Sequence, residues 1–172
     1  MGNSRKSPSP NKAVTTVAAR FERALEAILA RVVVSGGAIA VAYSGGLDSA
    51  LLLRLLAGHC RHNGRQLFAF HVHHGLSPNA DDWLTHCERE AAALGVAFDS
   101  ARVRLPDVAE HGVAQAARLA RYRALGELCK KHGVSLLLTA HHQDDQAETV
   151  LLQLFRGAGL RGLSGMAAAD DA

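Results

Sequence analysis

Ile39-Ala40-Val41-Ala42-Tyr43-Ser44-Gly45-Gly46-Leu47-Asp48-Ser49 is the segment around which this chain is organised. Its first half is a short apolar run that stops at two glycines. A second apolar segment with helical character, Ala50–Leu56, follows directly. We therefore expect a buried strand, a tight glycine turn and the start of a helix, in that order.

The turn has the features of a phosphate site. Gly45 and Gly46 carry no Cβ atom, so the backbone can bend sharply and bring its N–H groups close to a ligand. The first turn of the helix adds N–H groups without intrahelical partners and the positive end of the helix dipole. Ser44 and Ser49 add two hydroxyl donors. Together these donors predict that a phosphate group binds at the turn.

Asp48 does not fit a simple anion site, because a carboxylate repels bound phosphate. Either it caps the N-terminus of the helix, or a Mg²⁺ lies between it and the phosphate. The turn is not a Walker A loop, since no Gly-Lys-Ser/Thr ends it, and the G-x-G-x-x-G pattern of dinucleotide sites is absent. We favour a ligand-binding turn over a plain strand-to-helix connection.

The composition is that of one soluble globular domain. The chain has 172 residues and a formal net charge of +3, which is too small to argue for a nucleic-acid partner. It contains neither a signal-peptide pattern nor an apolar run of the roughly 20 residues that cross a bilayer, so no membrane association is expected. Cys60, Cys87 and Cys129 form no Cys-x-x-Cys pair, which predicts reduced, buried thiols in a cytoplasmic protein.

Helices and strands are expected to alternate along the chain. A polar leader rich in Pro and Ser over 1–12 is expected to be disordered, and one domain should occupy 13–172. The predicted helices are Val14–Val34, Ser49–His62, Ala80–Leu94, Val113–His132 and Asp144–Phe155. The predicted strands after the first are Gln66–Val72, Val96–Val103 and Val134–Thr139. This order predicts an α/β fold, an open parallel sheet with helices on both faces.

Histidines follow one of these strands in the run His71-Val72-His73-His74. His71 and His73 share one face of the strand, because side chains alternate along it. Neutral imidazoles bind transition metals, so a metal site is one interpretation. We favour a supporting role in a nucleotide pocket, because no carboxylate or thiol lies nearby at matching spacing.

A second cluster, His141-His142-Gln143-Asp144-Asp145, follows the last predicted strand. Ligands bind outside the carboxyl ends of strands in open sheets, and all three unusual clusters fall at such ends. The carboxylates either cap the next helix or include an Asp that shares a Mg²⁺ with Asp48. We favour the functional interpretation, in which His141 or His142 assists proton transfer.

Arginines on the long helix form a third candidate group. Arg118 and Arg121 are i,i+3 neighbours, with Tyr122 beside them. Such arginines are either a solvated helix face or a small patch for phosphate from ATP or RNA, and the pattern favours neither.

The ordered motifs resemble a known family. Ser44-Gly45-Gly46-Leu47-Asp48-Ser49 is similar to the S-G-G-x-D-S loop of the PP-loop ATP pyrophosphatases. Within that superfamily, the ordered series of motifs that this chain carries between Ile39 and Met166 resembles the bacterial tRNA(Ile)-lysidine synthases. Its later members are His71–Ser77, Ala117–Tyr122, Thr139–Thr149 and the Gly-rich Arg156–Met166.

The resemblance implies a Rossmann-like PP-loop domain of the adenine nucleotide alpha hydrolase type that uses ATP and Mg²⁺. It implies adenylation of the C2 oxygen of the wobble cytidine in the CAU anticodon of tRNA(Ile), followed by attack of L-lysine. The loop Ser44–Ser49 and His71 would bind ATP, and Asp48 and Asp145 would hold the metal. Near the reacting groups, the implied catalytic residues are Asp48, Arg118, His141, His142 and Asp145.

The chain departs from the family in two respects. A Glu usually precedes Ala117-Arg118, and Ala114-Gln115-Ala116 supplies none, which puts a role for that carboxylate in doubt. The family also continues beyond Ala172, usually into tRNA-binding domains, so we expect a fragment.

Two other functions stay open at this point. One is a tRNA cytidine 2-thiolase of the same superfamily, although such enzymes generally rely on paired cysteines. The other is a truncated module that binds ATP without completing transfer. The sequence is compatible with a homodimer.

Overall fold

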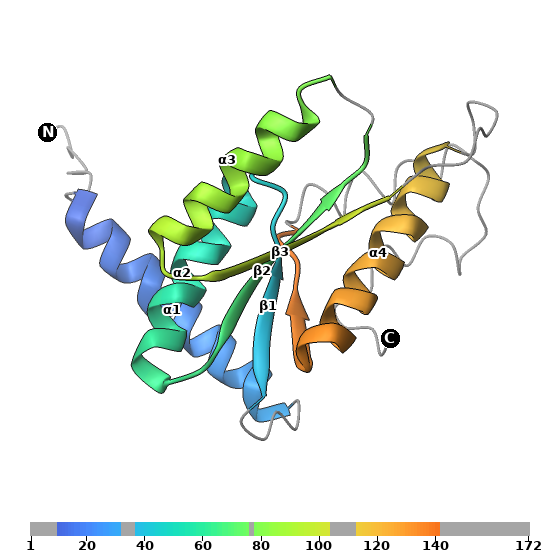
Figure 1. Cartoon of the computed structure of the whole chain (residues 1–172). Helices are drawn as coiled ribbons and strands as arrows, with labels where there is room; N and C mark the ends of the chain where they lie inside the picture. The colour runs from blue at the N-terminus through green and yellow to red at the C-terminus, as the bar shows by residue number, and fades with distance from the viewer. Residues whose placement is uncertain (1–9, 32–36, 76–77, 104–112, 142–172) are drawn as a thin grey trace, which may run out of the picture.

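The structure is a computed structural model that describes residues 10–31, 37–75, 78–103 and 113–141. Helices and strands alternate after the first helix (Figure 1). The elements are α1 (Pro10–Arg31), β1 (Ala38–Ala42), α2 (Leu47–Asn63), β2 (Leu67–His73), α3 (Ala80–Ala93), β3 (Ala97–Arg102), α4 (Val113–His132) and β4 (Val134–Leu138). The predicted alternation is therefore confirmed for this part of the chain.

Two helix starts differ from the prediction. Helix α1 begins at Pro10, so the last three residues of the expected leader belong to it. Proline suits a first helical turn, where its missing N–H costs no hydrogen bond. Helix α2 begins at Leu47, two residues earlier than predicted, which places Asp48 inside its first turn.

The four strands form one parallel sheet in the order β3-β2-β1-β4. Strand β1 lies inside the sheet, where Val41 pairs with Ala69 of β2 on one side and Leu138 of β4 on the other. Strands β1 and β2 are almost wholly buried, which explains their continuous apolar sequences. Strand β3 lies at the sheet edge and is only partly buried, which allows its polar residues.

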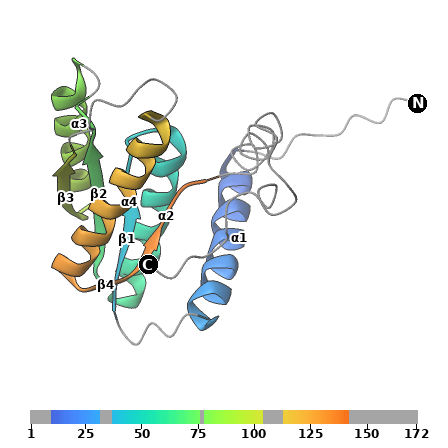
Figure 2. The same cartoon turned by 90° about the vertical axis from the view of Figure 1, so that its right-hand side faces the viewer.

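Successive residues of the inner strands point into two separate cores. Ile39 and Val41 join the core built with α1, α2 and α3, whereas Ala40 between them joins the core built with α4. Helix α4 thus covers one face of the sheet, and α2 and α3 cover the other (Figures 1 and 2). Helices on both faces of an open parallel sheet were predicted, and the structure confirms them.

Helix α1 packs outside α2 rather than directly on the sheet (Figure 2). Its Leu25 is buried in the larger core, and the carboxylate of Glu22 hydrogen-bonds the buried ring of His59 on α2. An apolar contact through Leu25 and a polar contact through Glu22 therefore attach α1 to the α2 side of the molecule.

The cysteines match the expectation of free thiols. Cys60 and Cys87 are buried, and Cys129 is half-buried. In the described part of the chain, no helix combines the length and apolarity needed to cross a bilayer. The structure does not describe residues 1–9 of the leader, the segment 104–112, the predicted helix Asp144–Phe155 or the Gly-rich segment 156–166.

Candidate active site

A pocket of about 800 Å³ opens at the carboxyl ends of the strands. From β1 the chain proceeds through β2 to β3 on one side, and α4 then returns it to β4 on the other side of β1. Ligands of open α/β sheets bind where the strand order reverses in this way. The volume lies in the range of small-molecule sites, so a ligand of nucleotide size fits.

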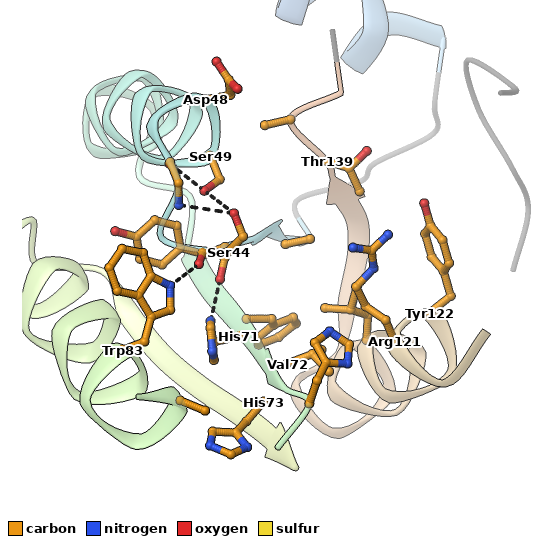
Figure 3. A pocket seen from close by; sticks show the side chains of 18 of the residues that line it. Ser44, Asp48, Ser49, His71, Val72, His73, Trp83, Arg121, Tyr122 and Thr139 are labelled. Atoms are coloured by element: carbon orange, nitrogen blue, oxygen red, sulfur yellow. Dashed lines mark hydrogen bonds between the residues drawn. The ribbon is translucent and has the colours of Figure 1, made fainter. Parts of the chain in front are cut away.

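Residues from four parts of the chain line the pocket, one of them being the start of α3 with Asn79, Ala80 and Trp83 (Figure 3). The loop after β1 contributes Ser44, Gly46, Asp48 and Ser49, and the end of β2 contributes His71, His73 and His74. The opposite wall consists of Arg121, Tyr122, Thr139 and His141 from α4 and the segment after β4. The fold thus brings together two of the clusters that the sequence singled out and His141, the one described residue of the third.

Hydrogen bonds within the loop hold both of its hydroxyl groups. Buried Ser49 donates from Oγ to the carbonyl of Gly46 at 2.9 Å, and its Oγ lies 3.0 Å from Ser44 Oγ. Gly46 donates its N–H to Ser44 Oγ at 3.3 Å. The serines therefore shape the loop, and a bound phosphate would have to compete with these bonds for their hydroxyl protons.

The structure argues against the capping explanation of Asp48. The N-cap of α2 is Gly46, and within the described part of the chain no side-chain capping hydrogen bond is found at this helix start. Asp48 is the second residue of α2, is exposed and lines the pocket. Not every predicted loop residue faces the pocket: Leu47 is 84% exposed and is not part of its lining, and neither is Gly45.

Gly45 is covered by helix α3. Its φ of +83° is a conformation that side chains rarely allow, and an added Cβ would lie 2.6 Å from Cys87 Sγ and 2.9 Å from Trp83 Nε1. Trp83 also donates from Nε1 to the carbonyl of Ser44 at 2.7 Å (Figure 3). Sequence reasoning missed Trp83, because its contact with the loop depends on how α3 packs on β2 and β3. The one sequence feature that could have pointed to Trp83 is its position in the first turn of a helix that starts at the ligand-binding edge of the sheet.

His71 is a buried, neutral ring at the base of the pocket. Its Nδ1 lies 2.9 Å from the carbonyl oxygen of Tyr43, which can only accept, so Nδ1 carries the proton and Nε2 is left as an acceptor. Burial lowers the pKa of His71, with a smaller lowering from His73, although the bond to Tyr43 raises it. Burial and the nearby Arg121 also lower the pKa of His74. These two rings therefore add no positive charge at neutral pH.

His73 belongs to a polar cluster at the side of the pocket. Its Nε2 lies 3.3 Å from the carboxylate of Asp81 on α3, which also pairs with Arg102 at the end of β3. The hydrogen bond and charge of Arg102 lower the pKa of Asp81. Among the described residues, no group of three or more His, Cys, Asp or Glu side chains is placed to hold a metal ion. The supporting role that we favoured for the histidines stays a prediction.

The two arginines of the predicted patch lie together. The guanidinium carbons of Arg118 and Arg121 are 5.6 and 5.5 Å from the centre of the Tyr122 ring. Arg121 and Tyr122 line the pocket, whereas Arg118 is exposed and does not (Figure 3). The predicted role of Arg118 remains a prediction.

The last cluster is described only at its beginning. Thr139 Oγ1 lies 3.0 Å from Nδ1 of exposed His141, and both residues line the pocket. His142 and Asp145 lie outside the described residues, so their predicted catalytic and metal-binding roles stay predictions.

The donor set suits a magnesium ion carried by a nucleotide. Mg²⁺ in phosphate sites is commonly held by one or two carboxylates together with the phosphates, and Asp48 offers an exposed carboxylate beside the loop. Asp48 would hold such an ion, which would neutralise phosphate charge next to the loop donors.

The fold and this site define a class of protein. The sequence profile of the PP-loop domain matches residues 16–172, and the chain belongs to this family. Membership in a family of ATP pyrophosphatases implies the use of ATP.

Among curated proteins, the chain is similar to tRNA(Ile)-lysidine synthases. It is 57% identical over 134 residues to that of Burkholderia mallei, covering 75% of this chain and 26% of the relative. With that of Ralstonia nicotianae it shares 56% identity over 143 residues, covering 81% and 31%. With that of Bordetella bronchiseptica it shares 45% over 167 residues, covering 97% and 48%. The chain thus spans about a quarter to a half of these relatives.

A solved structure has the same fold at low sequence identity. The U34-tRNA thiolase NcsA from Methanococcus maripaludis, with its [4Fe-4S] cluster, matches with a TM-score of 0.64 and 18% identity. The match covers 73% of this chain and 45% of that one. It supports the Rossmann-like α/β architecture and carries no information about the reaction.

Proposed function

We propose that this chain is the ATP-binding catalytic part of a tRNA(Ile)-lysidine synthase. The observation that carries the proposal is the Ser-Gly-Gly loop in the pocket, at the point where the strand order of the sheet reverses. The chain that contains this loop is about half identical in sequence to enzymes of that name. The substrates are ATP, L-lysine and the tRNA(Ile) with a CAU anticodon. We expect the cytoplasm as its location, and a homodimer stays an untested prediction.

The reaction has two group-transfer steps. The C2 oxygen of the wobble cytidine attacks the α-phosphorus of ATP, the bond from that phosphorus to the bridging oxygen breaks, and pyrophosphate leaves. The ε-amine of lysine then attacks C2, the C2–O bond breaks, AMP leaves with the oxygen, and the amine loses a proton. Each step releases a phosphate-bearing group, so stabilising negative charge is the main task of the site.

The loop and the helix start supply that stabilisation. Backbone N–H groups at the beginning of α2, directly after the Gly46 N-cap, are proposed to face the phosphates of ATP, and the helix dipole favours negative charge there. Gly46 and Ser49 form the phosphate-facing side of the loop, and Asp48 would hold Mg²⁺ with the phosphates. Neutral His71 presents Nε2 as an acceptor for a nucleoside N–H or O–H.

The opposite wall is proposed to receive the cytidine and the lysine. Arg121 and Tyr122 offer a cation beside an aromatic face, which suits a phosphate and a base. Arg118, His141, His142 and Asp145 are proposed to act near the reacting atoms. Supporting this, His141 lies on the pocket wall that faces the loop.

The thiolase alternative finds less support. None of the three cysteines lines the pocket, and burial raises the pKa of Cys60, Cys129 and Cys87, the last to about 11. A buried thiol with a raised pKa is a poor nucleophile, because the thiolate is the reactive form. Sulfur transfer through these residues is therefore disfavoured.

ATP–pyrophosphate exchange tests the proposal with Asp48→Ala and, as a control, Glu88→Gln on an exposed part of α3. In the presence of the CAU tRNA, we expect the unmodified protein and Glu88→Gln to exchange label and Asp48→Ala to lose it. Exchange that survives Asp48→Ala would contradict the role of Asp48. A protein that binds the tRNA equally well with or without Asp48 and never turns over ATP would be an RNA-binding module instead.

A further inference from the structure

We propose that Trp83 is a positioning residue for the phosphate loop and that its indole senses whether the loop is occupied. This inference rests on the proposed function only in that the loop Ser44–Ser49 holds the phosphates of ATP. It names a residue outside the loop, on α3, that sets the loop's geometry through direct contact.

The first argument is the contact itself. Trp83 Nε1 donates a 2.7 Å hydrogen bond to the Ser44 carbonyl, and the indole lies against Gly45 so closely that no Cβ fits between them. Trp83 also lines the pocket, although the side chain is 47% exposed. The half-exposed indole thus has its N–H bonded to the loop backbone and part of its ring in contact with Gly45.

The second argument is electrostatic. The carbonyls of Tyr43 and Ser44 are consecutive acceptors at the entrance to an anion site, where their partial negative charge opposes phosphate. His71 donates to the first carbonyl and Trp83 to the second (Figure 3). Each donor offsets the negative end of one carbonyl dipole, so the loop presents a more favourable field to phosphate.

The third argument is that the helix start carrying Trp83 is held in place. Asp81, two residues before Trp83, pairs with Arg102 at the end of β3 and with His73 at the end of β2. The Trp83 ring also packs on His86, with the ring centres 5.2 Å apart. The first turn of α3 thus connects the loop after β1 with the ends of two neighbouring strands.

The chain contains a single tryptophan, so its fluorescence reports on Trp83 alone. We would titrate the chain with inorganic pyrophosphate and with Mg-ATP, follow tryptophan emission, and measure affinity independently by calorimetry. We expect tryptophan emission to change until it saturates, with its midpoint at the ligand concentration that matches the dissociation constant from calorimetry. Trp83→Phe, which removes the N–H donor and keeps an aromatic ring, should bind pyrophosphate about five- to tenfold more weakly.

Thr85→Val is the matched control. This substitution removes the hydrogen bond that Thr85 Oγ1 donates to the backbone carbonyl of Asp81. Like the Trp83 bond, it runs from an α3 side chain to the backbone, but it does not touch the loop. Thr85→Val should bind pyrophosphate like the unmodified chain, and both variants should give closely similar thermal unfolding midpoints. If Trp83→Phe does not fold, the emission titration of the unmodified chain decides the matter.

Three results would each overturn the inference while leaving the proposed function intact. Trp83→Phe could bind pyrophosphate with wild-type affinity, or both variants could lose the same affinity. The unmodified chain could also bind without any change in tryptophan emission. Failure of the unmodified chain to bind both Mg-ATP and pyrophosphate would instead overturn ATP binding itself, and the inference with it.

Discussion

The Nδ1 atom of His71 lies 2.9 Å from the carbonyl oxygen of Tyr43, and this hydrogen bond connects β2 to the end of β1 below the pocket. Both residues are buried, at 6% and 3% exposure. Because the carbonyl requires a donor, the bond fixes the ring as the neutral tautomer with its second nitrogen available as an acceptor.

Replacing His71 should affect stability and its dependence on pH. His71→Ala leaves the buried Tyr43 carbonyl without this donor and should cost about 1–3 kcal/mol of unfolding free energy, whereas His71→Asn keeps an N–H donor and should cost less. The native pKa of His71 is lowered, so the unfolded chain takes up protons first as the pH falls below the ordinary 6.5. Stability is therefore full above that pH and declines below it.

Urea unfolding between about pH 5 and pH 8 measures both effects. The fall in unfolding free energy with falling pH should be shallower in His71→Asn. Part of this fall should persist in the variant, because the pKa of His74 is also lowered. His62→Asn, at an exposed histidine of α2, is the control and should keep the wild-type slope. An unchanged slope in His71→Asn would refute the assignment of a buried neutral ring.

Gly45 should tolerate no side chain. Gly45→Ala places a Cβ against Cys87 and Trp83 in a left-handed conformation, so we expect a stability loss of about 1–3 kcal/mol and weakened binding of Mg-ATP. Gly58→Ala is the matched control, because Gly58 lies within α2 with no heavy atom near the added Cβ. It should stabilise the helix by about 0.5–1 kcal/mol. Wild-type ATP binding by Gly45→Ala in calorimetry would show that the loop does not need its observed conformation.

Asp99 should make the fold sensitive to acid. Burial tends to raise its pKa, but hydrogen bonds from His132, Lys131 and the Ser100 N–H outweigh this and lower the pKa to about 2. A depressed native pKa gives stability that is present above the ordinary 3.8 and is lost as the pH falls toward about 2.

Asp99→Asn should therefore reduce the free energy of unfolding by about 1–3 kcal/mol near neutral pH. On acidification, the variant should lose less of its remaining stability than the unmodified chain. Thermal unfolding at about pH 7 and about pH 3 measures this, with Glu88→Gln as the exposed control. If both proteins decline in parallel on acidification, the Asp99 cluster at the end of α4 does not contribute the expected stability.

The fold was predictable because its signals are local. Helix α4 begins and ends where the sequence predicts, since Gly133 follows its last residue, His132, and allows the left-handed turn found there. Strands β1, β2 and β4 were recognisable from nearly continuous apolar runs, and the alternation of strands with helices fixes a parallel sheet. The loop Ser44–Ser49 was found because its glycines and its position between strand and helix are both visible in sequence.

The site was less predictable where it depends on packing between elements. Trp83 on α3, which packs on β2 and β3, reaches over to the loop after β1, and no spacing in the sequence encodes that contact. The choice between Arg118 and Arg121 depends on the rotation of α4 about its axis, and the structure places Arg121 on the pocket wall. The hydroxyls of Ser44 and Ser49 were predicted as ligand donors, yet they bond within the loop.

Incorporation of labelled L-lysine into an unmodified tRNA(Ile) with a CAU anticodon tests the proposed function most directly. It should be measured with Mg-ATP for this chain, for a longer version as extensive as the relatives, and for the longer version carrying Asp48→Ala. We predict incorporation by the longer version that requires ATP and is lost with Asp48→Ala. A longer version that binds Mg-ATP and the tRNA but incorporates no lysine would contradict the lysidine assignment and leave only the PP-loop family.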